Sequence, residues 1–366
     1  AKGLEFLFRA NGVEVIHGTA RLVGDGKLLV QTSEQVDEFL ASEIVVATGS
    51  RPAELSCLVV DGRRVLNSDD ALDIVTFPES LAIVGAGAVG LEFATFFSRL
   101  GTRVVVVEMC EQVLPGIDRE IAILLRRLME RDGVDFRLGA KVLGCEDGRL
   151  LYRNSDGSDG AVSVDRVLVA TGRTPATEGL GLEAVGATVD GQGFVVTDRN
   201  YRSGQVVAIG DVRGGRLLAH KAMREGLIAA ELIAGRRPRR AHAIPLCVYT
   251  DPEVASVGMS EEEARREGYD VIVVQVPASA VGRSLTLARS EGICRMTADA
   301  RTGRILGVTM LCAQADVLIA EACLAVELRL KVDELGRAVH PHPTMSELLF
   351  EAAEAITGRA VHIINR

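Results

Sequence analysis

The stretch Leu81-Ala-Ile-Val-Gly-Ala-Gly-Ala-Val-Gly90 decides the fold of this 366-residue chain. Its apolar start predicts a buried strand that runs directly into a glycine-rich turn and then into a helix from Leu91 to Leu100. Gly85, Gly87 and Gly90 form the pattern G-x-G-x-x-G, in which backbone N–H groups and the helix N-terminus hold a pyrophosphate. A turn that serves packing alone is the alternative.

The next predicted strand, 103–108, supports a dinucleotide site. It ends in Glu108, about 20 residues beyond the first glycine, where a carboxylate accepts hydrogen bonds from the adenosine ribose. A carboxylate there also repels a 2′-phosphate. The two features together favour a dinucleotide over packing, and NAD over NADP.

An internal repeat indicates a second domain of the same type. The segment Ile44-Val-Val-Ala-Thr-Gly-Ser-Arg-Pro52 recurs as Val167-Leu-Val-Ala-Thr-Gly-Arg-Thr-Pro175, and each copy is typical of a strand followed by a turn. A glycine-rich loop precedes only the second copy. The corresponding loop of the first copy would fall before residue 1, so we expect the chain to lack the start of its first domain.

The sequence therefore predicts an α/β protein with two Rossmann-like nucleotide-binding domains, the first incomplete, and a C-terminal α+β domain. We expect the first domain to comprise residues 1–74 and 196–243, the second 75–195, and the C-terminal domain 244–366. Strands and turns are expected over 1–70. Helices are expected over 217–233, 315–328 and 344–356.

Composition limits the function classes. The 41 basic and 50 acidic residues give a net charge of −9, which disfavours nucleic acid and anionic membranes as partners. Glu92 interrupts the longest apolar stretch, 81–97, so a membrane span is not expected. The seven cysteines show no CxxC or CxxxxC spacing, which favours free thiols in a reducing compartment and a cytoplasmic location.

Two acidic residues allow more than one interpretation. Glu92, one turn into the predicted helix, either complements the helix dipole or faces the reactive ring of a cofactor. Asp211 lies at the end of a predicted strand, 206–212, and precedes a helix start at Leu217-Leu-Ala-His220. It either binds a ribitol or ribose hydroxyl or forms a simple Gly-Asp turn.

The segment His340-Pro-His-Pro-Thr-Met-Ser-Glu347 has three competing interpretations. Thr344 and Glu347 match a capping box at the start of the last helix. The two histidines and the carboxylate are also metal-ligand types, but no other ligand cluster accompanies them and we expect no metal site. The third interpretation is a proton-transfer pair, with Glu347 orienting the His342 imidazole and stabilising its charged form.

The order of motifs ATGS, GAGAVGLE, ATGR, AIGD, LAH and HPHPTMSE resembles the flavin-dependent pyridine nucleotide-disulfide oxidoreductases, and among them the dihydrolipoamide dehydrogenases. The resemblance covers nearly the whole chain. It implies FAD and NAD as cofactors, a homodimer with residues 244–366 as its dimerisation domain, and a dihydrolipoyl substrate, possibly on a carrier protein of a 2-oxoacid dehydrogenase complex.

The resemblance also implies roles for individual residues. His342 would be the proton acceptor for the active site of the other subunit, held by Glu347. The FAD contacts would be Thr48, Gly49, Ser50, the backbone at Ala20, Asp211, Leu217, Leu218, Ala219 and His220. The NAD contacts would be Gly85, Gly87, Gly90, Glu92, Glu108, Val142 and Gly172.

The chain departs from the family pattern because two of the family's motifs are absent from it. The family's first G-x-G-x-x-G and its CxxxxC redox dithiol lie in an N-terminal segment that these 366 residues do not include, so we expect the chain alone to be inactive. Ala20 replaces a usual glycine, and His340-Pro replaces His-Ala. The rival hypotheses are a non-catalytic NAD-binding or dimer-forming protein and a related NAD-dependent disulfide reductase.

The position of Glu108, with no arginine in the next few positions to receive a 2′-phosphate, predicts the cofactor preference. NAD should bind more tightly than NADP by about 1–3 kcal/mol, roughly tenfold to a hundredfold. Calorimetric or fluorescence titration with both nucleotides measures this difference, and equal affinities would contradict the prediction.

Overall fold

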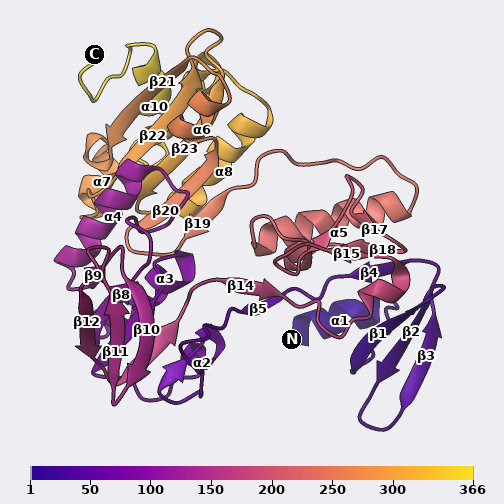
Figure 1. Cartoon of the computed structure of the whole chain (residues 1–366). Coiled ribbons are helices and arrows are strands. Elements are labelled where there is room, and N and C mark those ends of the chain that lie inside the picture. Colours follow the sequence, from indigo (N-terminus) through magenta and orange to yellow (C-terminus); the bar gives the residue numbers. More distant parts are fainter. Residues whose placement is uncertain (1, 366) are drawn as a thin grey trace. The chain divides into compact units, whose positions relative to one another are not determined.

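A five-stranded parallel sheet contains the strand predicted at Leu81, in a computed structural model that describes residues 2–365 (Figure 1). The central strand β7 (Ser80–Val84) is buried at all five positions. The strand order is β6-β13-β7-β8-β9, with β6 at Val65–Leu66, β13 at Arg166–Val169, β8 at Arg103–Val107 and β9 at Asp135–Arg137. Parallel sheets are normally covered on both faces, which explains the unbroken apolar runs.

Alternate residues of β7 supply two separate cores. Leu81 and Ile83 pack with the helices α3 (Ala88–Arg99) and α4 (Arg119–Arg131) on one face. Ala82 and Val84 pack on the other face against an antiparallel meander, β10 (Lys141–Glu146), β11 (Arg149–Arg153) and β12 (Asp159–Ser163). The short helix α2 (Ser68–Leu72) precedes β7, and Asn67 and Asp70 cap it reciprocally.

The C-terminal domain is built on a five-stranded antiparallel sheet. Its order is β19-β20-β23-β22-β21, with β19 at Leu246–Val248, β20 at Glu253–Gly258, β23 at Ile305–Cys312, β22 at Ile293–Asp299 and β21 at Val271–Pro277. The helices are α6 (Glu261–Arg266), α7 (Gly282–Thr286), α8 (Ala315–Glu327), α9 (Val332–Gly336) and α10 (Glu347–Ile356), with a 3₁₀ turn, η3 (Ala278–Ala280). Val248, Val254, Ile293 and Leu311 of this sheet belong to the core formed by α3 and α4.

The chain divides into two compact units because of this shared core. The second unit comprises residues 52–172 together with the chain from 241 onward, and the first comprises the chain up to Arg51 together with 173–240. The expected domain boundaries were 74/75, 195/196 and 243/244. In the structure β6, within 52–74, pairs with β13 in the parallel sheet of the second unit, so this segment belongs to that compact unit.

The first unit holds a second, smaller group of sheets. An antiparallel meander joins β1 (Thr19–Gly24), β2 (Lys27–Gln31) and β3 (Val36–Leu40). A three-stranded sheet has the order β17 (Arg202–Ser203), β18 (Val206–Ala208) and β4 (Ile44–Val46), followed by α5 (Ala219–Ile233). The remaining elements are β5 (Ser50–Pro52) paired with β14 (Arg173–Pro175), β15 (Thr188–Val189) paired with β16 (Val195–Val196), and the 3₁₀ turns η1 (Leu182–Val185) and η2 (Gly210–Arg213).

In the first unit, the edge strand β4 and the helix α1 (Lys2–Ala10) are exposed. Among the described residues, β4 pairs only with β18, and Val45 on it is 41% exposed although its sequence is that of a buried strand. The helix α1, which was not expected over 1–70, has no buried residue. Apolar side chains at Leu4, Phe6 and Leu7 therefore face solvent.

The predicted fold class is confirmed, since the structure has parallel α/β architecture and a separate antiparallel α+β domain. The expected strand, glycine turn and helix at 81–100 are present as β7 and α3. Within residues 2–365, no helix combines the length and apolar character that crossing a membrane requires.

The packing around α3 yields a stability prediction for two glycines. A Cβ at Gly90 would lie 2.0 Å from the Gly85 carbonyl oxygen, so Gly90→Ala should destabilise the second unit by about 1–3 kcal/mol. Gly226 in α5 is the matched control, because a Cβ there meets only Ile209 Cδ1 at 3.8 Å. Gly226→Ala should raise stability by about 0.5–1 kcal/mol. Circular dichroism during thermal unfolding measures both, and a Gly90→Ala protein as stable as the parent would contradict the prediction.

Candidate active site

The glycine turn between β7 and α3 leaves room for a ligand. Gly85 has a φ of +108°, and a Cβ there would lie 2.4 Å from the Ala170 carbonyl oxygen. Gly87 is the N-cap of α3 and has no side chain to bond the free N–H groups; a Cβ at that position would meet nothing within 4 Å. Sterics thus require Gly85 and Gly90, whereas Gly87 opens the helix N-terminus to an approaching phosphate.

Glu108 lies against this turn. Its Oε2 accepts a hydrogen bond of 2.6 Å from the Ala86 N–H, and its Oε1 accepts one of 2.8 Å from the Cys110 N–H. The end of β8 and the glycine loop are therefore joined through one half-buried carboxylate. This arrangement fits the pyrophosphate and ribose of a dinucleotide.

The other predicted NAD contacts lie in different surroundings. Gly172 has a φ of +132° and follows β13, the neighbour of β7. The Val142 side chain is buried in the core between the parallel sheet and the β10–β12 meander, so only its backbone can face a ligand.

Glu92 makes a contact that neither interpretation of the sequence included. Its Oε1 accepts a hydrogen bond of 2.9 Å from the Tyr249 N–H, just after β19 of the C-terminal domain. Burial raises the pKa of this carboxyl, and the hydrogen bond from Tyr249 partly offsets that effect. Arg99 at the end of α3 pairs with Asp251, so the helix is fixed to the same segment at two points.

In the first unit, Ser50 connects residues from both copies of the internal repeat. Its hydroxyl donates to Asp211 Oδ2 at 2.6 Å and accepts from Arg173 Nε at 2.7 Å. Thr48 donates to the Ala176 carbonyl oxygen at 2.7 Å, and Gly49 has a φ of +74°. The structure therefore brings Thr48, Gly49, Ser50 and Asp211 together.

The remaining predicted FAD contacts occupy two places in this unit. Leu217, Ala219 and His220 lie at the start of the 15-residue helix α5, whose N-cap, Leu218, makes no side-chain cap. An uncapped helix N-terminus can receive an anion. Ala20 lies in β1 opposite Val30.

Sequence reasoning missed a buried charge cluster beside Asp211. Lys221 and Glu225, one turn apart on α5, are both buried. Glu225 accepts from the Gly210 N–H at 2.7 Å and from Arg213 at 2.6 Å, and Lys221 donates to the Gly214 carbonyl oxygen at 2.9 Å. These contacts fix η2, the turn that carries Asp211. The i, i+4 spacing of two charges on the apolar face of a helix was the available signal.

His342 and Glu347 form a hydrogen-bonded pair. Nδ1 of His342 lies 2.8 Å from Glu347 Oε1, while Oε2 of the same carboxylate accepts a hydrogen bond of 2.9 Å from the Thr344 N–H. The His342 side chain is 70% exposed and that of Glu347 only 11%. Burial raises the pKa of Glu347, but the hydrogen bonds from His342 and Thr344 outweigh it and leave the pKa below its ordinary value.

The capping-box interpretation is wrong in its details. The last helix begins at Glu347 rather than at 344, because the Thr344 hydroxyl bonds the Pro341 carbonyl oxygen and Ser346. Only the half of the box in which Glu347 accepts from the Thr344 N–H is present. The two histidines also do not meet at one ligand position, since His340 pairs with Glu321.

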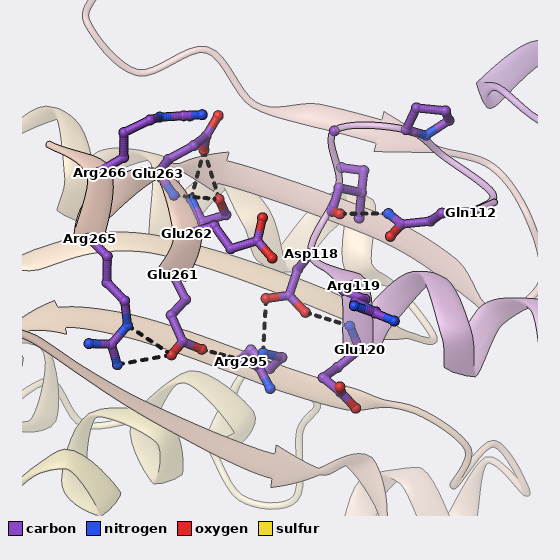
Figure 2. A pocket seen from close by; sticks show the side chains of 14 residues that line it. Gln112, Asp118, Arg119, Glu120, Glu261, Glu262, Glu263, Arg265, Arg266 and Arg295 are labelled. Atoms are coloured by element: carbon purple, nitrogen blue, oxygen red, sulfur yellow. Dashed lines mark hydrogen bonds and ion pairs between the residues drawn. The ribbon is translucent and has the colours of Figure 1, made fainter. Parts of the chain in front are cut away.

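A cavity of about 790 Å³ lies elsewhere in the second unit, between the start of α4 and α6 (Figure 2). At its wall Arg295 pairs with Asp118, the N-cap of α4, and with Glu261. None of the residues predicted for the site lines this cavity.

Comparison with known proteins assigns the class. Residues 1–226 match the model of the pyridine nucleotide-disulphide oxidoreductase family, and residues 244–353 match the dimerisation domain of that family. The chain belongs to the pyridine nucleotide-disulphide oxidoreductases.

Within this family the chain is of the dihydrolipoyl dehydrogenase type. It is 43% identical to the dihydrolipoyl dehydrogenase of Thermus scotoductus, covering 100% of this chain and 80% of the relative. It is 41% identical to dihydrolipoyl dehydrogenase 3 of Pseudomonas aeruginosa, covering 98% and 79%.

Solved structures agree with the fold. The HOCl-induced flavoprotein disulfide reductase RclA from Escherichia coli has a TM-score of 0.85 at 28% identity, covering 96% of this chain and 83% of that one. LpdA from Mycobacterium tuberculosis has a TM-score of 0.88 at 27% identity, covering 96% and 79%.

Family membership confirms the predicted cofactors, FAD and NAD(H), and the dimerisation domain supports the predicted homodimer. The geometry of two helix starts in this chain suits these cofactors. The open N-terminus of α3 and Glu108 suit a dinucleotide in the second unit. The open N-terminus of α5 and the Ser50–Asp211 pair suit a second nucleotide in the first unit.

Proposed function

We propose that the chain serves the oxidation of dihydrolipoyl groups, with electrons passing through a dithiol and FAD to NAD. The observation that carries this proposal is the exposed imidazole of His342 held by the buried carboxylate of Glu347 at 2.8 Å. The identities of 43% and 41% to dihydrolipoyl dehydrogenases favour this substrate over that of another disulfide reductase. A non-catalytic binding protein would not need an exposed, oriented imidazole.

The pair determines which nitrogen of His342 acts as the base. A carboxylate accepts hydrogen bonds, so Nδ1 carries the hydrogen that points to Glu347. Nε2 is then the basic nitrogen, and within residues 2–365 no side chain or backbone group bonds it. Nε2 takes the proton from a substrate thiol, and Glu347 stabilises the imidazolium that forms.

The thiolate produced in this way attacks a disulfide. Its sulfur forms a mixed disulfide and expels one sulfur of the attacked disulfide as a thiolate. The second substrate thiol then closes the lipoyl disulfide and leaves a reduced dithiol. FAD and NAD supply the two-electron acceptor chemistry that reoxidises it.

We infer that His342 serves the site of a second copy of the chain. The helix α8 exposes Val317 and Leu324, and its C-cap Leu328 is exposed as well, in the domain that matches the family's dimerisation domain. Burial of these side chains against a second copy would stabilise the homodimer. The expected substrate carrier is a protein of a 2-oxoacid dehydrogenase complex, and seven free cysteines support a cytoplasmic location.

The NAD side of the proposal uses residues of the second unit. Gly85, Gly87 and Gly90 would hold the pyrophosphate, Glu108 the adenosine ribose, and Gly172 the edge of the same site. Glu92, fixed by the Tyr249 N–H, would line the side of α3 that faces the cofactor. Thr48, Ser50, Asp211 and the start of α5 would hold FAD.

The cysteine spacing predicts that these 366 residues alone do not turn over lipoamide. The seven cysteines include no CxxxxC pair, so the redox dithiol would have to come from outside them. We expect no NADH-dependent lipoamide reduction and little bound flavin. Absorbance of the purified chain at the flavin band, together with its intact mass and a lipoamide assay, measures both. Turnover by the verified chain, or stoichiometric flavin, would contradict this prediction.

A substitution of His342 tests its role as a base in a protein that also contains the redox dithiol. His342→Gln should lower dihydrolipoamide oxidation by about 10²- to 10⁴-fold, the usual range for a lost general base. Transfer of electrons from NADH to an artificial acceptor should change little, since it needs no thiol deprotonation.

Thr344→Ala is the matched structural control for this experiment. It removes the hydroxyl bonds to Pro341 and Ser346 and should cost about 1 kcal/mol of stability. Both activities should stay similar per folded molecule. Equal losses of both activities in His342→Gln would show that His342 is not the base.

A further inference from the structure

His340 lies two residues before His342 but points into the protein. Its side chain is 7% exposed, and its ring centroid lies 6.0 Å from that of Phe350 on α10. Nε2 lies 3.0 Å from Glu321 Oε1 on α8, and Nδ1 lies 3.1 Å from the Ala338 carbonyl oxygen. Both ring nitrogens therefore have a partner.

Both partners of His340 are acceptors. A backbone carbonyl can only accept a hydrogen bond, and so can an ionised carboxylate. A neutral imidazole donates from one nitrogen only, so it would leave one of these contacts as two acceptors facing each other. The imidazolium form satisfies both contacts at once.

The charges around the ring also favour the imidazolium form of His340. The hydrogen bond from His340 to Glu321 raises the pKa of His340, and burial lowers it by less. The charge of Glu321, the Ala338 carbonyl oxygen and the charge of Glu347 raise it further. The charged groups that face the ring are thus Glu321 from α8 and Glu347 from α10, both acidic; Phe350 is uncharged.

We propose that His340 is held as an imidazolium by Glu321 and the Ala338 carbonyl oxygen, and that it positions the backbone from which His342 reaches Glu347. This inference rests on the function proposed for His342. Only Pro341 separates the two histidines, and its ring fixes φ, so movement at 340 is passed on to His342. His340 is a positioning residue, because its buried ring cannot reach a substrate.

The pair also connects two parts of the proposed site. Glu321 lies on α8, whose exposed apolar face includes Val317 and Leu324. The ion pair therefore ties the segment that carries His342 to the helix we assign to the contact between subunits. Through Glu321, the orientation of the base is linked to the helix proposed for the subunit contact.

The raised pKa of His340 fixes the pH dependence. A group whose folded pKa lies above its unfolded value stabilises the folded state fully below the unfolded pKa, about 6.5 for histidine. The stabilisation is lost as the pH rises through the folded pKa. The anchoring of the His342 segment should therefore weaken on the alkaline side.

Nuclear magnetic resonance of the 366-residue chain with isotope-labelled histidine tests this inference without cofactor or turnover. The chain has six histidines, so each ring signal can be assigned by substitution. We expect the His340 signal to titrate above pH 6.5. Glu321→Gln should lower the proton-binding constant of His340 by about tenfold or more, because it removes the charge and keeps the shape. Glu262→Gln, at an exposed carboxylate of α6, is the matched control and should leave the His340 titration unchanged.

A second variant tests the positioning role itself. In the parent chain the ring-nitrogen shifts of His342 should report one tautomer, with hydrogen on Nδ1. His340→Phe keeps a buried ring but removes both donors, and the His342 shifts should then move towards a mixture of tautomers. A loss of stability alone would not change the tautomer of an exposed ring.

Two results would overturn the proposal. One is a His340 signal that titrates at or below pH 6.5. The other is a folded His340→Phe chain, verified by circular dichroism, in which the His342 tautomer is unchanged. Neither depends on whether His342 is the base, which the activity ratio of His342→Gln decides separately.

Discussion

The contact between Gly90 and the Gly85 carbonyl oxygen holds the start of α3 against the end of β7. No side-chain atom fits between them, since a Cβ would lie 2.0 Å from that oxygen. Because the helix begins so close to the strand, Glu108 at the end of β8 reaches the Ala86 N–H. The same placement lets Glu92 and Arg99 reach the segment 249–251 of the C-terminal domain. The close approach of two glycines thus determines both the geometry of the proposed nucleotide site and the attachment of the C-terminal domain.

The sequence predicted what depends on local pattern. The glycine loop, the acid at the end of the next strand and the repeated ATG segments are contiguous in sequence, and each predicted its strand and turn correctly. The His342–Glu347 pair was predicted for the same reason, because its members are only five positions apart in sequence. The fold class followed from the order of these elements.

Contacts between distant segments could not be predicted from a single sequence. Nothing near Glu92 marks Tyr249 as its partner, and nothing near His340 marks Glu321. The same holds for residues 52–74, because the pairing of β6 with β13 places this segment in the second compact unit. The helix α1 was not predicted. Its apolar residues, such as Phe6, are exposed and, within the described part of the chain, belong to no hydrophobic core.

The shared core of the second unit has a consequence for synthesis. The helices α3 and α4 complete their apolar surface with Val248, Val254, Ile293 and Leu311, which the ribosome adds only after the whole of 173–240 has been made. Until those residues are made, the apolar faces of α3 and α4 in the nascent chain are exposed to solvent. Slow translation or lack of a chaperone at this stage would therefore leave these helix faces exposed to aggregation for longer.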